Sequence, residues 1–307
     1  MAGGDVILTV TLNAALDVTY HVPALRPGRS HRVSEVAVRA GGKGVNVARV
    51  LHALGHDTLV TGFAGGTELQ ADLAAAGIRE SLVELDGPAR RTVTVVTPEE
   101  ATPLNEPGPR VSISDWARLV GDFHQLAERA DVVVLSGSLP PGLPSDAYAQ
   151  LIRATTTPVV LDAAGPALLD GIPAGPRLVK PNADELAEVA GHDDPLAAAR
   201  ELRARGTGAV VASLGADGLL AVTGDGTWRA RPELVRGNPT GAGDACVAAL
   251  AAGLARGDDW PALLADAVAL SAAAVVCPLA GDVDLDTYRR LAPAIEVEEL
   301  PHADPDR

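Results

Sequence analysis

The chain has 307 residues, of which 47% are hydrophobic, and it carries a formal net charge of −15. That charge argues against a nucleic acid or an anionic membrane as partner, because either would require a basic face. No apolar run approaches the ~18 residues of a membrane-spanning helix, and the first residues lack a signal-peptide pattern, so we expect a cytoplasmic protein.

The first strand is expected over residues 5–12, which are apolar at odd and even positions, as in a strand buried on both faces of a sheet. Residues 18–40 instead alternate apolar with polar side chains, and so does the segment 91–96. This alternation predicts half-exposed strands outside the main sheet, within about 18–40 and 91–113, that pair as a small lid.

A regular alternation of strands and helices fills most of the chain. A glycine turn at 41–44 precedes a predicted helix over 45–54. Further helices are expected near 114–129, 145–154, 242–255 and 261–276, with strands at 131–135, 159–162, 178–179 and 209–214 and an antiparallel excursion over 218–231. This order is typical of an α/β fold with a mostly parallel sheet. We expect residues 1–299 to form one domain and residues 300–307 a loose tail.

The stretch GNPTGAGDAC (237–246) stands directly before an alanine-rich helix. Gly241 and Gly243 permit backbone conformations that turn the N–H groups, including that of Ala242, toward one point, and Asp244 lies beside them. Thr240 or Asp244 could equally be an ordinary helix cap. Donors for a developing phosphoryl charge beside a base are nevertheless what phosphoryl transfer to an alcohol requires.

Two other strand ends carry candidate residues. In KPNADEL (180–186), Asn182 and Glu185 are one helical turn apart and could either hold magnesium through waters or form a capping box; the spacing fits both. The sequence GGKGVN (41–46) fits neither dinucleotide nor P-loop spacing, whereas Lys43 as a phosphate contact and Asn46 as a hydroxyl contact suit it better. The chain has only two lysines, Lys43 and Lys180, and both lie in these motifs.

Seven segments together resemble the ribokinase-like phosphofructokinase B family. They occur in the family's order and span nearly the whole chain: TLNAALD (11–17), GGKGVNVARVL (41–51), LNEPGP (104–109), SGSLPPGLP (136–144), LVKPNADEL (178–186), SLGADG (213–218) and PTGAGDA (239–245). The GGKGxN and LNEPG elements look most like its phosphosugar branch, 1-phosphofructokinase and tagatose-6-phosphate kinase. The resemblance implies a Rossmann-like αβα sandwich with a β-lid, and ATP-dependent, Mg²⁺-dependent transfer to a sugar phosphate.

The resemblance also implies residue roles. Asp244 would be the catalytic base, following Gly241, with the N–H groups of Ala242 and Gly243 as an anion hole. Asp17, Gly42 and Asn46 would contact the sugar hydroxyls. Lys43 and Arg91 would bind the phosphate that the sugar already carries, and Ser138 is a further candidate near that phosphate. The nucleotide would lie along Lys180, Asn182, Ser213, Gly215 and Gly218. The helix over Ser271–Val276 would lie against the adenine. Asn182 and Glu185 would hold the hydrated Mg²⁺. A potassium requirement stays open, and a homodimer through the lid is an analogy.

Three departures from the family pattern bear on activity. Val93 stands where phosphosugar members often have a polar Asn two residues after the arginine, the segment at 65–77 is shortened, and Cys277–Gly281 replaces the usual glycine-containing turn near the nucleotide. Val93 and the shortened segment motivate one alternative, a catalytically silent sugar-phosphate binding or regulatory protein. A kinase of a neutral sugar or nucleoside is another.

Fructose 1-phosphate is the favoured acceptor, yielding fructose 1,6-bisphosphate. Tagatose 6-phosphate and fructose 6-phosphate stay open, because a ketofuranose has a CH₂O group at both ends. One pocket can therefore accept a 1-phosphate attacked at O6 or, inverted, a 6-phosphate attacked at O1.

Overall fold

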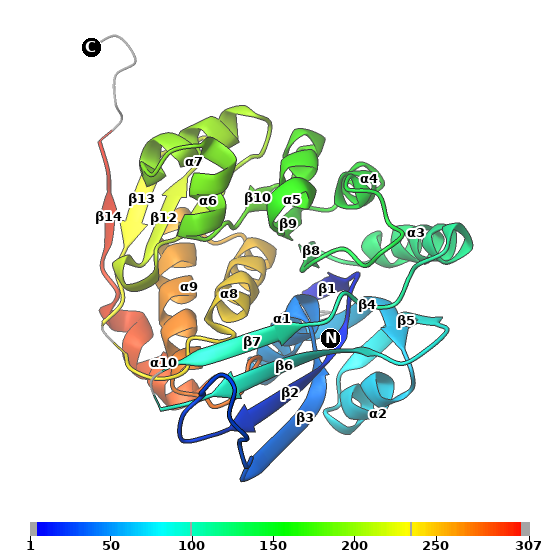
Figure 1. Cartoon of the computed structure of the whole chain (residues 1–307). Helices are drawn as coiled ribbons and strands as arrows, with labels where there is room; N and C mark the ends of the chain where they lie inside the picture. The colour runs from blue at the N-terminus through cyan, green and yellow to red at the C-terminus, as the bar shows by residue number, and fades with distance from the viewer. Residues whose placement is uncertain (1–4, 99, 234, 302–307) are drawn as a thin grey trace.

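A ten-stranded sheet forms the centre of the computed structural model, which describes residues 5–98, 100–233 and 235–301 (Figure 1). Its strands in spatial order are β14 (Val297–Glu299), β13 (Thr227–Ala230), β12 (Leu219–Val222), β11 (Val210–Ser213), β10 (Leu178–Val179), β9 (Val159–Asp162), β8 (Val132–Ser136), β1 (Val6–Thr11), β4 (Asp57–Gly65) and β5 (Arg79–Leu85). Neighbours from β11 to β5 pair in parallel, and β12, β13 and β14 add an antiparallel edge.

Helices cover both faces of this sheet. One face is covered by α3 (Ile113–Ala127), α4 (Ala147–Arg153), α5 (Gly165–Gly171), α6 (Ala183–Ala190) and α7 (Pro195–Ala204). The opposite face is covered by α1 (Lys43–Ala53), α2 (Glu68–Ala75), α8 (Ala242–Arg256), α9 (Trp260–Val275) and α10 (Leu285–Leu291). Short 3₁₀ turns complete the chain: η1 (Ile172–Ala174), η2 (Gly215–Asp217) and η3 (Ala292–Ala294).

The side-chain alternation of the strands explains the layers. In β1, Leu8 packs into the core that contains α3 and α4, whereas its neighbour Ile7 packs into the core that contains α8 and α9. In β8, Val133 and Val134 divide in the same way. A strand apolar on both parities must be covered twice, so the predicted α/β fold with a mostly parallel sheet is confirmed.

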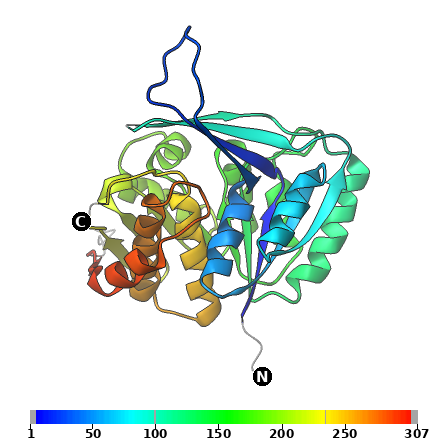
Figure 2. The same cartoon turned by 90° about the horizontal axis from the view of Figure 1, so that it is seen from below.

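A second, four-stranded sheet lies over one end of the large sheet. Its strands in spatial order are β3 (Glu35–Gly41), β2 (Ala15–His21), β6 (Arg90–Val96) and β7 (Ala101–Asn105). Figure 2 shows these strands together along one side of the molecule, with the loop between β2 and β3 projecting from it. This is the predicted lid. Its first strand begins at Ala15, earlier than expected, because β2 follows β1 after only a three-residue turn.

The segment at 65–77 contains the helix α2. The end of the chain differs from expectation. The chain stays ordered beyond residue 299: the N–H of Leu300 donates to the Thr227 carbonyl at 2.8 Å, and the Leu300 side chain packs against the core. The predicted loose tail therefore does not begin at residue 300, and residues 302–307 lie outside the described part of the chain.

Candidate active site

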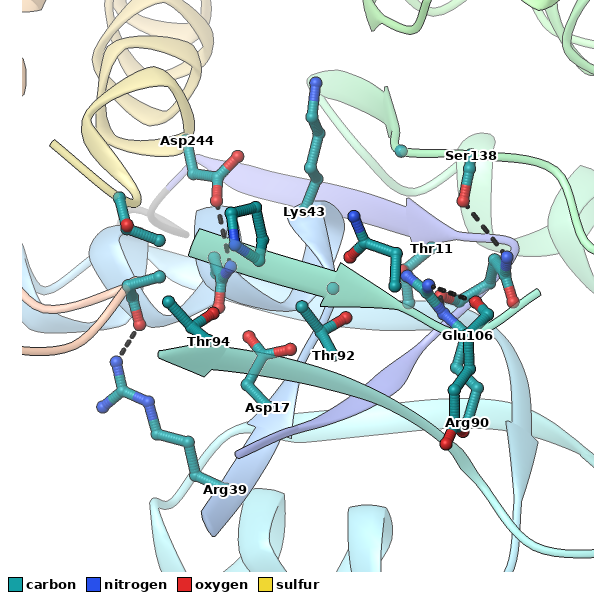
Figure 3. Close-up of a pocket in the computed structure, with 18 of the residues that line it drawn as sticks. Thr11, Asp17, Arg39, Lys43, Arg90, Thr92, Thr94, Glu106, Ser138 and Asp244 are labelled. Atoms are coloured by element: carbon teal, nitrogen blue, oxygen red, sulfur yellow. Dashed lines mark hydrogen bonds between the residues drawn. The ribbon is translucent and has the colours of Figure 1, made fainter. Parts of the chain in front are cut away.

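A cavity of about 820 Å³ lies between the inner face of the lid and the carboxyl ends of the central strands. Figure 3 shows Asp244 on one side of it, Ser138 and Arg90 on the other, and Lys43 between them. Predicted site residues that line it are Asp17, Gly42, Lys43, Asn46, Ser138 and Asp244. Segments more than 200 residues apart in the sequence thus contribute to one cavity at the edge where parallel strands end.

Asp244 lies in the first turn of α8. The helix begins after Gly241, whose φ of 89° is in the left-handed region that glycine adopts readily, and no side chain caps it. The carboxylate instead accepts a hydrogen bond from Nδ2 of Asn46 at 2.9 Å. Asp244 is therefore not acting as a helix cap, and it faces the cavity together with Asn46.

Burial changes the acidity of Asp244. The side chain is 7% exposed. Desolvation raises the pKa of the Asp244 carboxyl to about 7 and the negative charge of Asp162 adds to the rise, although Lys43, the hydrogen bond from Asn46 and Lys180 oppose it. A carboxyl with a pKa close to neutrality is suited to accept a proton in one step and release it afterwards.

Both lysines of the chain meet at one buried carboxylate. Nζ of Lys43 lies 3.3 Å and Nζ of Lys180 3.5 Å from Oδ1 of Asp162, while Ser136 donates to Oδ2 at 3.1 Å. Burial alone would raise the pKa of Asp162, but Lys180 and then Lys43 lower it below its ordinary value. Burial would likewise lower the pKa of Lys43, but Asp162 and then Asp244 raise it. The Lys43 ammonium therefore stays charged beside Asp244.

The sequence pattern did not identify Asp162 as a site residue. It is the last residue of β9, after three apolar residues, and it pairs with Ser136 in the parallel register of β8 and β9. A single acid at the end of a buried strand was the signal available. The strand order needed to join it to both lysines was not readable from the sequence.

The lid presents polar side chains to the cavity, among them Asp17 of β2. Burial raises the pKa of the Asp17 carboxyl, and Arg90, Arg39 and the N–H of Gly42 partly oppose that rise. The structure thus brings Asp17 into a group of positive and donor side chains. Further residues of the lid and its edge that line the cavity, and to which the sequence pattern assigned no role, are Arg39, Thr92, Thr94, Asn105 and Glu106.

The structure corrects the arginine assigned to the acceptor phosphate. Side chains alternate along β6, and Arg90 and Thr92 line the cavity while Arg91 does not. Arg91 is exposed, and its backbone N–H donates to the carboxylate of Glu106 at 2.7 Å. Two residues after Arg90 comes Thr92, so the cavity has a polar side chain there, and Val93 also does not line it. The departure expected at Val93 arose because the motif had been placed one residue too far along the chain, at Arg91 and not at Arg90.

The residues expected at the nucleotide and at the anion hole do not line this cavity: Lys180, Asn182, Glu185, Ser213, Gly215, Gly218 and Ser271, together with Gly241, Ala242 and Gly243 of the turn before Asp244. Lys180 lies close to the turn before Asp244, since a methyl group at Gly243 would lie 3.8 Å from its Nζ. Asn182 forms an isolated parallel bridge with Ser213, which brings those two motifs together.

Asn182 and Glu185 form the capping box at the start of α6. Oδ1 of Asn182 accepts from the Glu185 N–H at 2.8 Å, and Oε2 of Glu185 accepts from the Asn182 N–H at 2.9 Å. The capping alternative is therefore confirmed. Oε1 of Glu185 has no hydrogen-bond partner among the described residues, so a further role for this carboxylate stays a prediction.

No helix within the described ranges has the length and apolarity needed to cross a membrane.

Comparison with known proteins gives the same fold along nearly the whole chain. Phosphofructokinase-2 from Escherichia coli, solved in complex with potassium, is 27% identical, with a TM-score of 0.87 over 95% of this chain and 99% of that one. A possible 1-phosphofructokinase from Thermotoga maritima is 25% identical, with a TM-score of 0.88 over 96% and 100%. Ribokinase from Thermotoga maritima, 19% identical over 94% and 99% with a TM-score of 0.79, shares the fold.

The model of the "pfkB family carbohydrate kinase" matches residues 9–287, which include every strand of the lid and every candidate site residue described above. With this match and the structural neighbours, the chain is a sugar kinase that belongs to the pfkB family of carbohydrate kinases.

Proposed function

We propose that this protein transfers the γ-phosphoryl group of ATP to a ketohexose phosphate and forms a 1,6-bisphosphate, with fructose 1-phosphate as the favoured acceptor. The observation that carries the proposal is the two-ended cavity: a base, Asp244, lies at one end, and Arg90 and Ser138 lie at the other, with Lys43 between them (Figure 3). A bound sugar with a phosphate at one end and a hydroxyl at the other matches this arrangement of charge.

In the proposed reaction, Asp244 accepts the proton of the acceptor's hydroxyl as its oxygen attacks the γ-phosphorus of ATP, and ADP leaves. Asn46 holds the carboxylate through its Nδ2 donor. Lys43, which stays charged next to Asp162, can balance negative charge between acceptor and donor. The N–H group of Gly243 is proposed to stabilise the transferring group at the start of α8. The expected second donor, the N–H of Ala242, instead donates to the Pro239 carbonyl at 3.2 Å.

Members of this family are expected to use Mg²⁺ with ATP. The available donors fit this ion, because Glu185 retains a free carboxylate oxygen, and an amide and a carboxylate at a strand end suit a hydrated hard cation. Asn182 and Glu185 would hold Mg²⁺ through waters, and the ion would neutralise phosphate charge. Ser213, Gly215 and Gly218 are proposed to lie along the nucleotide, and Ser271 near the adenine.

We also propose that the lid is a dimer interface. Its outer face exposes three large apolar side chains, Val36 and Val38 of β3 and Leu104 of β7, which are 53%, 55% and 57% exposed. The related E. coli enzyme has been solved in a "tetrameric inhibited form". The described residues, with Leu300 packed against their core, are proposed to act as one domain, in the cytoplasm, where ATP and sugar phosphates are available.

An ADP-release assay tests the acceptor, with fructose 1-phosphate, fructose 6-phosphate, tagatose 6-phosphate and fructose compared, each with and without K⁺. We expect the highest kcat/KM for fructose 1-phosphate. E. coli phosphofructokinase-2 has been solved in complex with fructose-6-phosphate, so a preference for that acceptor would keep the phosphosugar kinase and change the acceptor. Equal kcat/KM for fructose would refute a phosphosugar kinase, and no ADP release with any of the four sugars would refute the proposed reaction.

A further inference from the structure

We propose that Asn13 is a positioning residue that orients Ser138 and Arg90 toward the acceptor's phosphate and so favours phosphorylated over neutral sugars. The inference rests on the proposed function. It also assigns a role to the segment 104–109, whose contribution the sequence motif did not explain.

Asn13 follows β1 and is 6% exposed. Its Nδ2 group donates to Oγ of Ser138 at 3.1 Å and to the carbonyl of Pro107 at 3.2 Å. Both of its donor hydrogens are thereby used to join the loops after β7 and β8. Because the Ser138 oxygen accepts this bond, the hydroxyl hydrogen of Ser138 remains available to a ligand. Ser138 and Asn13 both line the cavity.

The backbone of Asn13 fixes the second phosphate contact. Its carbonyl accepts a hydrogen bond from Nε of Arg90 at 2.9 Å, and the carbonyl of Glu106 accepts from Nη1 of Arg90 at 3.0 Å. A guanidinium is planar, so two bonds of this kind determine where its other N–H groups point. Nη2 has no hydrogen-bond partner within the described residues, and Arg90 lines the cavity. It can therefore bind an anionic group there.

Gly108 makes room for this arrangement. A side chain at Gly108, whose φ is 92°, would place its Cβ 2.2 Å from Oδ1 of Asn13 and 3.2 Å from Cδ of Arg90. Any larger residue would displace the Asn13 side chain and crowd the Arg90 side chain. The glycine between Pro107 and Pro109 is thus required by close approach as well as by backbone conformation.

Asn13 is incompletely satisfied as a structural residue. Its Oδ1 atom is buried and has no hydrogen-bond partner among the described residues. A buried amide oxygen without a partner destabilises a fold, and such groups in native proteins call for another explanation. Orientation of Ser138 and Arg90 at the cavity provides that explanation.

The test measures initial rates of Asn13→Ala with fructose 1-phosphate and fructose. This variant keeps the backbone carbonyl that binds Arg90 and removes only the bonds to Ser138 and Pro107. We expect the KM for fructose 1-phosphate to rise about tenfold, while kcat, the KM for ATP and the KM for fructose change by less than about threefold. The control is Thr207→Val, which removes buried hydrogen bonds to the carbonyls of Pro176 and Ala209 at a site outside the cavity. Its kinetics should match the wild type.

Two further variants separate positioning from loss of structure. If Asn13 acts through Ser138, the double variant Asn13→Ala with Ser138→Ala has the same KM for fructose 1-phosphate as Ser138→Ala alone. Gly108→Ala leaves Asn13 in the chain but displaces its side chain, and it should raise the same KM in the same direction. Thermal unfolding of each variant verifies that it is folded.

The outcomes distinguish the two proposals. A wild-type enzyme that uses fructose as well as fructose 1-phosphate overturns the proposed function and this inference with it. A wild-type enzyme that prefers the phosphorylated acceptor, together with an Asn13→Ala enzyme of unchanged preference, overturns the role of Asn13 alone. Multiplicative effects of the Asn13 and Ser138 substitutions on KM would show that the two residues act separately, which also overturns it.

Discussion

Replacing Asp244 with Asn should abolish most activity and at the same time stabilise the protein at alkaline pH. Asn keeps an oxygen that can accept the hydrogen bond from Asn46 but can neither accept the hydroxyl's proton nor carry a charge. Loss of a base typically removes ~10² to 10⁴ in rate, so we expect kcat to fall by that range. Initial rates of ADP release, with fructose 1-phosphate as acceptor, measure this loss.

The stability gain follows from the raised pKa of Asp244. Its carboxyl has a pKa of about 7 in the folded protein, against 3.8 as the ordinary value. Because the pKa of Asp244 is higher in the folded protein than in the unfolded chain, its protonated form favours the folded state. This contribution to the free energy of unfolding is fully present below pH 3.8 and is lost as the pH rises through about 7. The shift corresponds to roughly 4 kcal/mol at pH 8, at 1.36 kcal/mol per pKa unit. Asn avoids this cost because it stays neutral.

Thermal unfolding at pH 8 and pH 5 measures this effect. The Asp244→Asn variant should unfold on the order of 6 °C above the wild type at pH 8, from an unfolding entropy of roughly 2.1 cal/mol/K per residue. The difference should shrink to less than half at pH 5, where the folded wild type is already protonated at this position. The control is Asp122→Asn on α3. The Asp122 carboxylate is exposed and forms a weak ion pair with Arg118 at 4.0 Å, so its loss should change neither kcat nor the unfolding temperature.

Two results would refute this reasoning. Near-normal kcat in Asp244→Asn would show that Asp244 is not the base. An unfolding temperature equal to that of the wild type at pH 8, or a difference independent of pH, would show that burial does not raise the pKa of this carboxyl.

Three further predictions concern the same cavity. Arg90→Ala should raise the KM for fructose 1-phosphate by at least tenfold, whereas Arg91→Ala should leave it unchanged; similar effects of both in steady-state kinetics would contradict the correction in β6. In the wild type, kcat/KM for that acceptor should fall tenfold per unit of pH below about 7, since the protonated fraction of Asp244 is inactive. Asp162→Asn removes a negative charge that raises the pKa of Asp244, so the acid limb of its pH profile should move to lower pH; an unmoved limb would show that the two carboxylates are not coupled.

The sequence predicted the layers of the fold because its strongest signals are local. Apolar runs of four to six residues between amphipathic segments identify buried strands and covering helices, and β9 and β10 have the predicted bounds. The glycine turn before Asp244 was equally readable, because two glycines and an acid stand directly before an alanine-rich helix. The weaker elements, such as β7 and β14, are short and lie at sheet edges, where polar and apolar residues mix.

The choice between Arg90 and Arg91 could not be made from the sequence. Adjacent residues in a strand point to opposite faces, so the choice depends on which face of the lid covers the cavity. That face is set by the pairing of β6 with β2, in which Thr92 lies opposite Asp17. A one-residue difference in register moves every side chain of a strand to the other face, which is also why Val93 had been expected to alter the cavity.

The two lysines show a second limit of prediction from the sequence, which concerns contacts between distant strands. Lysine was already unusual in the sequence, since the chain has 25 lysines and arginines and all but these two are arginines. The carboxylate that the two lysines share depends on the order of three parallel strands. Ser136 and Asp162 end β8 and β9, and the N–H of Lys180, just after β10, donates to the Leu161 carbonyl. These groups must therefore lie at one edge.

The structure also gives a reason for lysine at both positions. Two ammonium groups approach the same carboxylate oxygen of Asp162, which is 1% exposed. An ammonium is a compact charge with three rotatable donors, whereas an arginine fork engages both oxygens of a carboxylate along one plane. Two guanidinium groups that each engage both carboxylate oxygens could not share Oδ1 of Asp162. One of them would also displace the Ser136 hydroxyl from Oδ2. Lysine leaves both ammonium groups with donors still free to act beside Asp244, one toward the acceptor's side of the cavity and one toward the turn at Gly243.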